Sequence, residues 1–189
     1  RSEILATAIL GLTLFGEAVS GLGFLSMLVC VSGLVAITIA KSGKLEQLWN
    51  KSAIYGLTAG VSLSLTSLLI RQASLSFGID DALLTAALTL AYLVLIQTVI
   101  CLGLLALKQP QEFTVILVRW RISLFVGLTS LVGSVGWFTA FTLERAAYVK
   151  TLGQVEFLFT LAIAVFVFRE IPNRLEWLGM GVLLIGVVA

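Results

Sequence analysis

Long apolar stretches, nearly free of charge, are the feature that most limits how this chain can fold. The stretches that lie between charged connectors run 18 to 26 residues. At a rise of 1.5 Å per residue, a helix of that length crosses a hydrocarbon core of about 30 Å. Helices are expected because an open sheet edge cannot satisfy its backbone polar groups in lipid. The stretches are residues 4–15, 22–40, 53–70, 82–107, 122–143, 146–168 and 175–189.

Composition supports an all-α, polytopic membrane helix bundle and excludes several other classes. Hydrophobic residues make up 59% of the 189 residues and charged residues 12%, too few to cover a soluble domain. A net charge of +2 gives no reason to expect a nucleic-acid partner. The chain has no histidine, which removes imidazole metal sites and histidine-based catalysis. No nucleophile–base set is apparent, so we expect neither an enzyme nor a metal or cofactor site.

Small residues recur on single helix faces in two of the apolar stretches. Such faces let a neighbouring backbone approach closely, which is how membrane helices associate. We interpret both rows as packing surfaces. One row is Ser26, Cys30 and Gly33, and the other is Gly56, Gly60, Ser64 and Ser67.

A helix start signal lies in the last connector. Asn173 is followed three residues later by Glu176, the spacing of a capping box. Because this pattern is common, it predicts where the final helix begins and says nothing of function.

The two ends of the chain are related by an internal repeat. When residues 1–36 are placed over residues 154–189, 12 of the 36 pairs are identical, whereas chance would give about three. The first repeat is then truncated, and residues 41–189 form a second repeat of five helices that follows the end of the first, residues 1–40. An odd number of spans inverts the second half relative to the first, as in many secondary transporters. The identical pairs include Glu3 with Glu156, Thr7 with Thr160, Met27 with Met180 and Gly33 with Gly186.

With these features the chain resembles the ten-helix drug/metabolite transporter superfamily, of the EamA type, from its fourth helix to its tenth. Phe15-Gly16-Glu17 resembles the "GE" turn that ends each half in such families, and Phe168-Arg169-Glu170 resembles the second turn with Arg in place of the usual Gly. Residues 135–140 and 144–146 also resemble the pattern of the second half. The order of these pieces, together with the repeat, carries the resemblance.

The resemblance implies a transporter that moves small organic metabolites or drugs, usually outward, by alternating access and without a bound cofactor. Proton coupling is open, and the alternative is a flippase for a lipid-linked sugar or a similar lipid carrier. We expect an integral protein of the plasma (inner) membrane of a bacterium, in contact with membrane lipid, as a monomer or a homodimer.

Two glutamates are the strongest candidates for a substrate or coupling site. Glu156 lies midway along the stretch 146–168, where an ionisable group is costly and usually faces a cavity or a partner. Glu3 holds the equivalent position in the first repeat. Thr160 and Thr7 follow at i+4, so each acid begins a polar face that we expect to line a hydrated path between the halves. The acids could bind an amino group or exchange a proton; if they are structural instead, Gln154 or Arg1 is the expected partner.

Two aromatic residues are further candidates. Trp137 lies deep in the stretch 122–143, where it could form an aromatic wall of the solute cavity or pack against helices or lipid. Tyr148 lies near a helix start, where it could gate the cavity or anchor the helix at the membrane interface.

Overall fold

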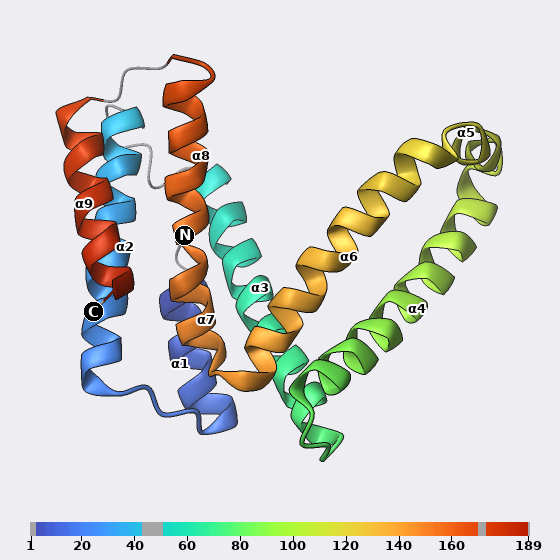
Figure 1. Ribbon diagram of the computed structural model, residues 1–189, viewed down its shortest axis with the longest axis horizontal. Helices are drawn as coiled ribbons and strands as arrows, with labels where there is room; N and C mark the ends of the chain where they lie inside the picture. The colour runs from blue at the N-terminus through green and yellow to red at the C-terminus, as the bar shows by residue number, and fades with distance from the viewer. Residues whose placement is uncertain (1–2, 43–50, 170–172, 189) are drawn as a thin grey trace. The chain divides into compact units, whose positions relative to one another are not determined.

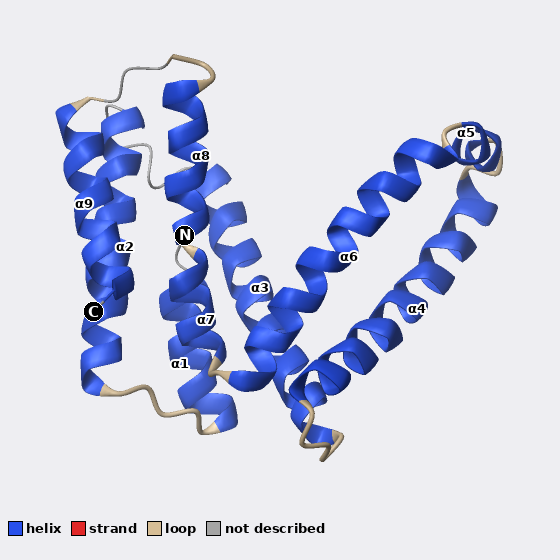
Figure 2. Ribbon diagram, in the orientation of Figure 1, coloured by secondary structure: helices blue, strands red, loops and turns tan. Residues whose placement is uncertain are grey.

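The computed structural model describes residues 3–42, 51–169 and 173–188, and their regular structure is helical, with no strand among them (Figures 1 and 2). The helices are α1 (Glu3–Phe15), α2 (Gly21–Ser42), α3 (Lys51–Ser76), α4 (Ala82–Lys108), α5 (Glu112–Val118), α6 (Trp120–Leu143), α7 (Ala146–Gly153), α8 (Val155–Phe166) and α9 (Arg174–Val188). An all-α membrane bundle is therefore confirmed as the fold class.

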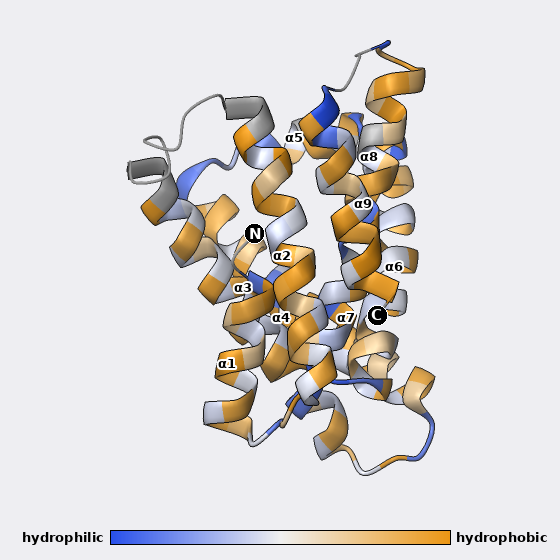
Figure 3. Cartoon of the chain, turned by 90° about the vertical axis from the view of Figure 1, so that its left-hand side faces the viewer, coloured by the Kyte–Doolittle hydropathy of each residue, from blue (hydrophilic) through white to orange (hydrophobic). Residues whose placement is uncertain are grey.

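The apolar stretches set the helix positions. Five segments of the described chain are long and apolar enough to cross a membrane, and apolar residues predominate along the helices in Figure 3. Each begins and ends within a few residues of a predicted stretch, except that α3 continues six residues further, to Ser76. The five segments are Gly21–Ile39, Ile54–Ser76, Ala82–Lys108, Trp120–Leu143 and Ala146–Phe166.

Two elements differ from the sequence-based expectation. The predicted connector 108–121 contains the short helix α5, which begins two residues after Pro110. Proline is well tolerated where a helix starts, because the first backbone N–H groups have no partner within the helix. The predicted helix 146–168 is divided into α7 and α8 at Gln154.

The capping box at the start of α9 is confirmed. The Glu176 backbone N–H donates to Asn173 Oδ1 at 2.9 Å, and the Asn173 backbone N–H donates to Glu176 Oε2 at 2.8 Å. The two bonds satisfy backbone donors that a helix start would otherwise leave unpaired.

The chain divides into two compact units. The first comprises Arg1–Leu69 and Glu144–Ala189, and the second Ile70–Leu143. In the second unit α4 packs against α6, with the small side chains of Thr85, Ala86 and Thr89 buried.

Arg71 secures the C-terminal end of α6 within the second unit. Its guanidinium donates to the backbone oxygens of Phe141 at 2.6 Å and Thr142 at 3.3 Å. Cations are favourable at this position because the last carbonyls of a helix lack partners and carry partial negative charge.

The first unit is built around the packing of α2 on α9. Of the two predicted small-residue rows, Ser26, Cys30 and Gly33 form this surface. A methyl group on Gly33 would lie 2.7 Å from Gly179 O and 2.7 Å from Leu183 N, so the two backbones are in contact. The row on α3 is buried at Gly60, Ser64 and Ser67, whereas Gly56 is exposed.

The contacts of α2 and α9 are antiparallel and reciprocal. Gly33 meets Gly179 and Leu183, while its repeat equivalent Gly186 meets Ser26 and Cys30. Under the 153-residue shift, Ser26 corresponds to Gly179 and Cys30 to Leu183, so each contact recurs with the roles exchanged. Figure 1 shows the two helices running side by side in opposite directions. A two-fold relation produces this pattern, as inversion of the repeats requires of these two helices.

Candidate functional site

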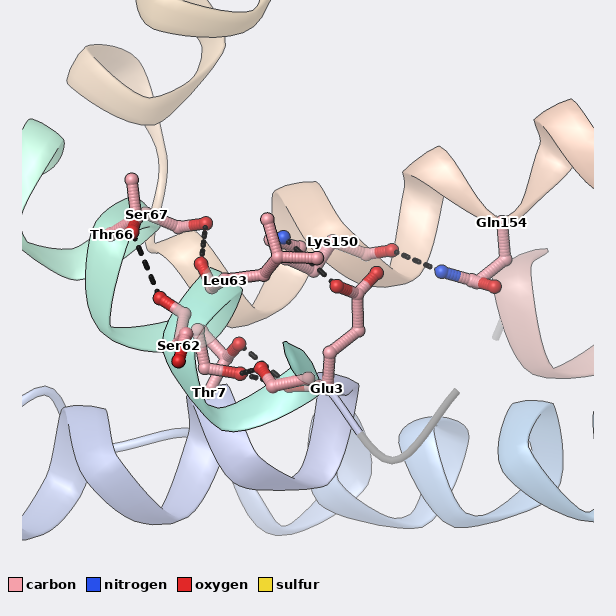
Figure 4. A network of polar contacts seen from close by, with 10 residues as sticks. Glu3, Thr7, Ser62, Leu63, Thr66, Ser67, Lys150 and Gln154 are labelled. Atoms are coloured by element: carbon pink, nitrogen blue, oxygen red, sulfur yellow. Dashed lines mark hydrogen bonds and ion pairs between the residues drawn. The ribbon is translucent and has the colours of Figure 1, made fainter. Parts of the chain in front are cut away.

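Glu3 opens α1 and forms a partly buried ion pair with Lys150 of α7. The Glu3 carboxylate lies 3.3 Å from Lys150 Nζ, and the side chains are 22% and 12% exposed, respectively (Figure 4). Glu3 is twelve residues before Phe15, which places it about 18 Å along α1 from that end, roughly half the thickness of a hydrocarbon core. The pair therefore puts two opposite charges among apolar helices.

Hydroxyl groups hold the backbone of Glu3 in place. Thr7 Oγ1 donates to the Glu3 carbonyl at 2.7 Å, and Ser64 Oγ of α3 donates to the same oxygen at 2.9 Å. Ser64 also donates to Gly60 O at 2.8 Å. The predicted polar face on α1, formed by Glu3 and Thr7, is thus present. The structure adds Ser64 to it, a residue that the sequence analysis interprets as part of a packing surface only.

Gln154 joins the same network by a route other than the expected one. Its side-chain amide donates to the Lys150 carbonyl at 3.2 Å, and this contact is drawn beside the ion pair in Figure 4. The expected partners of the glutamates were Gln154 and Arg1. Among the described residues Lys150 is the charged partner of Glu3, and Arg1 lies outside them.

The apolar segment Ala146–Phe166, which carries Lys150 and Glu156, has a locally tightened turn between them at Gln154. The backbone N–H of Gln154 donates to Thr151 O at 3.1 Å, and the N–H of Phe157 donates to Gln154 O at 2.9 Å. These bonds close over three residues, which tightens the helix locally. Gln154 itself keeps right-handed helical angles, with φ −66° and ψ −12°, and a short stretch of tighter turns inside a longer helix often marks a hinge.

Glu156 and Thr160 lie beyond this turn, on α8. Thr160 Oγ1 donates to Glu156 O at 3.0 Å, the same bond that Thr7 makes to Glu3 in the first repeat. The Glu156 side chain is exposed, and no ion pair joins it to another described residue. The structure thus keeps the local equivalence of the two acids but does not link Glu156 to the Glu3–Lys150 network.

Tyr148 holds the connector between α1 and α2. Its hydroxyl lies 3.0 Å from both the backbone nitrogen and Oγ of Ser20, and the Arg145 guanidinium donates to Ala18 O. A methyl group on Gly23 would lie 2.5 Å from Tyr148 Cε1, so the ring needs a glycine there. The connector also turns at Gly16, whose φ of 67° favours glycine.

Trp137 belongs to the second unit, on α6. Its ring lies 5.7 Å from that of Phe141, centroid to centroid, with an interplanar angle of 32°. The side chain is 40% exposed rather than deeply buried. Its role in a solute cavity stays a prediction.

Two hollows of the first unit are apolar, and neither Glu3 nor Lys150 lines them. One of about 320 Å³ lies between α1 and α2, and one of about 360 Å³ lies between α8 and α9. None of the predicted site residues lines either hollow. The Glu3–Lys150 pair therefore lies outside these two hollows.

Lys150 is the functional candidate that sequence reasoning undervalued. It is the other ionisable residue inside the stretch 146–168, so its position alone marked it as unusual. From its place near a helix start, beside Tyr148, a gate or an interfacial anchor is the role that the sequence alone suggests. Its partly buried contact with Glu3 moves it into the candidate site.

The fold and this site define an integral membrane protein with ionisable groups in its apolar segments. A family model described as the EamA-like transporter family matches residues 50–189. The chain belongs to the EamA-like transporter family, which confirms the resemblance; it is therefore a membrane transporter of small solutes. No curated protein and no solved structure matches the chain.

Proposed function

We propose that this protein exports small organic metabolites or drugs across the plasma (inner) membrane of a bacterium by alternating access. In this proposal the solute path passes the Glu3–Lys150 pair, and Glu156 presents the second acid. The observation that carries the proposal is a partly buried ion pair, 3.3 Å long, next to the tightened turn at Gln154 in the segment Ala146–Phe166. Buried charge has a high desolvation cost, so its retention inside a bundle favours a functional role.

The tightened turn supplies a physical basis for alternating access. At Gln154 the segment can change direction with less loss of backbone hydrogen bonding than within a regular helix. Lys150 precedes the turn and Glu156 follows it, so bending there would change the separation between the two charges. Exchange of a proton at the acids would couple such a change to the proton gradient.

Transport by the acid variants tests the proposal. We expect Glu156→Gln to fold normally, and Glu3→Gln to melt at a lower temperature because Lys150 loses its partner. Both folded variants should lose at least about tenfold in transport rate, which corresponds to about 1.4 kcal/mol in the barrier. Full-length protein in proteoliposomes, with solutes loaded on one side and an imposed pH gradient, gives the rate. Glu112→Gln, on the short helix α5, is the matched control and should transport as wild type does.

Equal transport by wild type and both acid variants at every pH would refute a central role for the acids. The same vesicles distinguish the alternative substrate class. If soluble solutes do not cross but a fluorescent lipid-linked sugar changes leaflet, the protein is a flippase and not an exporter of soluble metabolites.

A further inference from the structure

Lys150 is paired with the Glu3 carboxylate, the group that a cationic solute would bind. The ammonium lies 3.3 Å from a Glu3 carboxylate oxygen, close enough for direct electrostatic contact, and both side chains are largely buried. Thr7 and Ser64 bond to the backbone carbonyl of Glu3, not to its carboxylate. Within the described residues, Lys150 is therefore the charged partner of this acid.

Displacing that partner would be unfavourable for two reasons. Lys150 is tethered to the same chain, so it competes for Glu3 at a high effective concentration. An incoming cation would also leave the Lys150 ammonium buried and unpaired, a costly arrangement in a medium of low dielectric constant. The intact pair is neutral, and adding one cation would give the site a net positive charge.

We propose that Lys150 sets the charge selectivity of the site by excluding organic cations from Glu3. This inference rests on the proposed function in taking Glu3 to lie on the solute path. It makes Lys150 a specificity-determining residue: removal of its charge should create a cation site. Removal of the Glu3 charge should conversely leave Lys150 open to organic anions.

Binding of a fixed-charge probe tests the inference. Full-length protein in detergent is heated with benzyltrimethylammonium, and benzyl alcohol serves as the uncharged control, because a bound ligand raises the melting temperature by mass action. We expect Lys150→Gln to be stabilised at a probe concentration roughly tenfold or more below that needed by wild type. Lys150→Arg keeps the positive charge and should respond as wild type does.

Further variants test whether the stronger cation response of Lys150→Gln depends on Glu3, and they provide an alternative if Lys150→Gln does not fold. The double variant Lys150→Gln/Glu3→Gln should lose the gained response. If Lys150→Gln alone is unfolded, Glu3→Gln with benzenesulfonate provides the mirror experiment, and an anion response absent from wild type is expected. Exchange of the two charges in Glu3→Lys/Lys150→Glu should restore the folding and the weak cation response of wild type.

Two results would overturn the inference: wild type binding the cation as tightly as Lys150→Gln, or folded variants gaining no response to either probe. Binding is measured without transport, so the two proposals fail separately. A wild-type protein that moved no solute in vesicles would refute the proposed function, while the binding comparison would still decide the role of Lys150.

Discussion

Gly186 lies where the backbones of α9 and α2 touch, so its replacement by alanine probes the packing of the first unit directly. The added methyl group would lie 2.8 Å from Cys30 Cα and 2.9 Å from Ser26 O. Backbone atoms cannot rotate away, and overpacking of this kind costs roughly 1–3 kcal/mol. The higher helix propensity of alanine offsets up to about 1 kcal/mol. We expect Gly186→Ala to destabilise the protein by about 1–2 kcal/mol, a fall in melting temperature of roughly 2–8 °C.

Thermal unfolding of purified protein in detergent measures this effect. Gly181→Ala is the matched control, because Gly181 lies on the same helix and a methyl group there meets nothing within 4 Å. The control should melt at or slightly above the wild-type temperature. Gly33→Ala should repeat the loss, since Gly33 makes the reciprocal contact. Indistinguishable melting of Gly186→Ala and Gly181→Ala would refute the close backbone contact between the helices.

Two further predictions concern local hydrogen bonds. Tyr148→Phe removes the hydroxyl that contacts Ser20, so it should lower the free energy of unfolding by about 1–2 kcal/mol and raise the rate of amide hydrogen exchange at Ser20. Tyr55→Phe, whose ring is exposed, is the control and should change neither quantity. An unchanged exchange rate in Tyr148→Phe would show that the hydroxyl does not hold the connector. Asn173→Ala removes the side-chain acceptor of the capping box, so it should lower the free energy of unfolding by about 0.5–2 kcal/mol and speed hydrogen exchange at the Glu176 amide. If the variant kept both the stability and the exchange rate of wild type, the assigned cap would be contradicted.

The sequence predicts this fold well because its helices are fixed by local properties. Lengths of apolar stretches located the membrane-spanning helices, and the spacing of Asn173 and Glu176 located the start of α9. The small-residue row that contains Gly33 predicted a packing surface correctly, because small side chains are what such contacts require. These features depend on residues within a few turns of one another.

The sequence predicts the candidate site less completely because its contacts join distant segments. Glu3 and Lys150 are 147 positions apart, and nothing in their spacing identifies them as partners. Gln154 was a plausible partner for an acid, but its amide bonds to the carbonyl one turn earlier. The tightened turn at that residue follows Gly153, a weak helix-end signal that the sequence analysis did not use. The sequence could single out the two acids as unusual, whereas the counter-ion of Glu3 could be identified only from the fold.

The contact between α2 and α9 has a consequence for how this protein can move. With Gly33 against the backbone of α9 and Gly186 against the backbone of α2, neither helix can slide or roll past the other without a collision of main-chain atoms. We therefore expect the two helices to move together in a transport cycle. Flexing within the first unit is then left to looser places, of which the tightened turn at Gln154 is the one beside the charged groups.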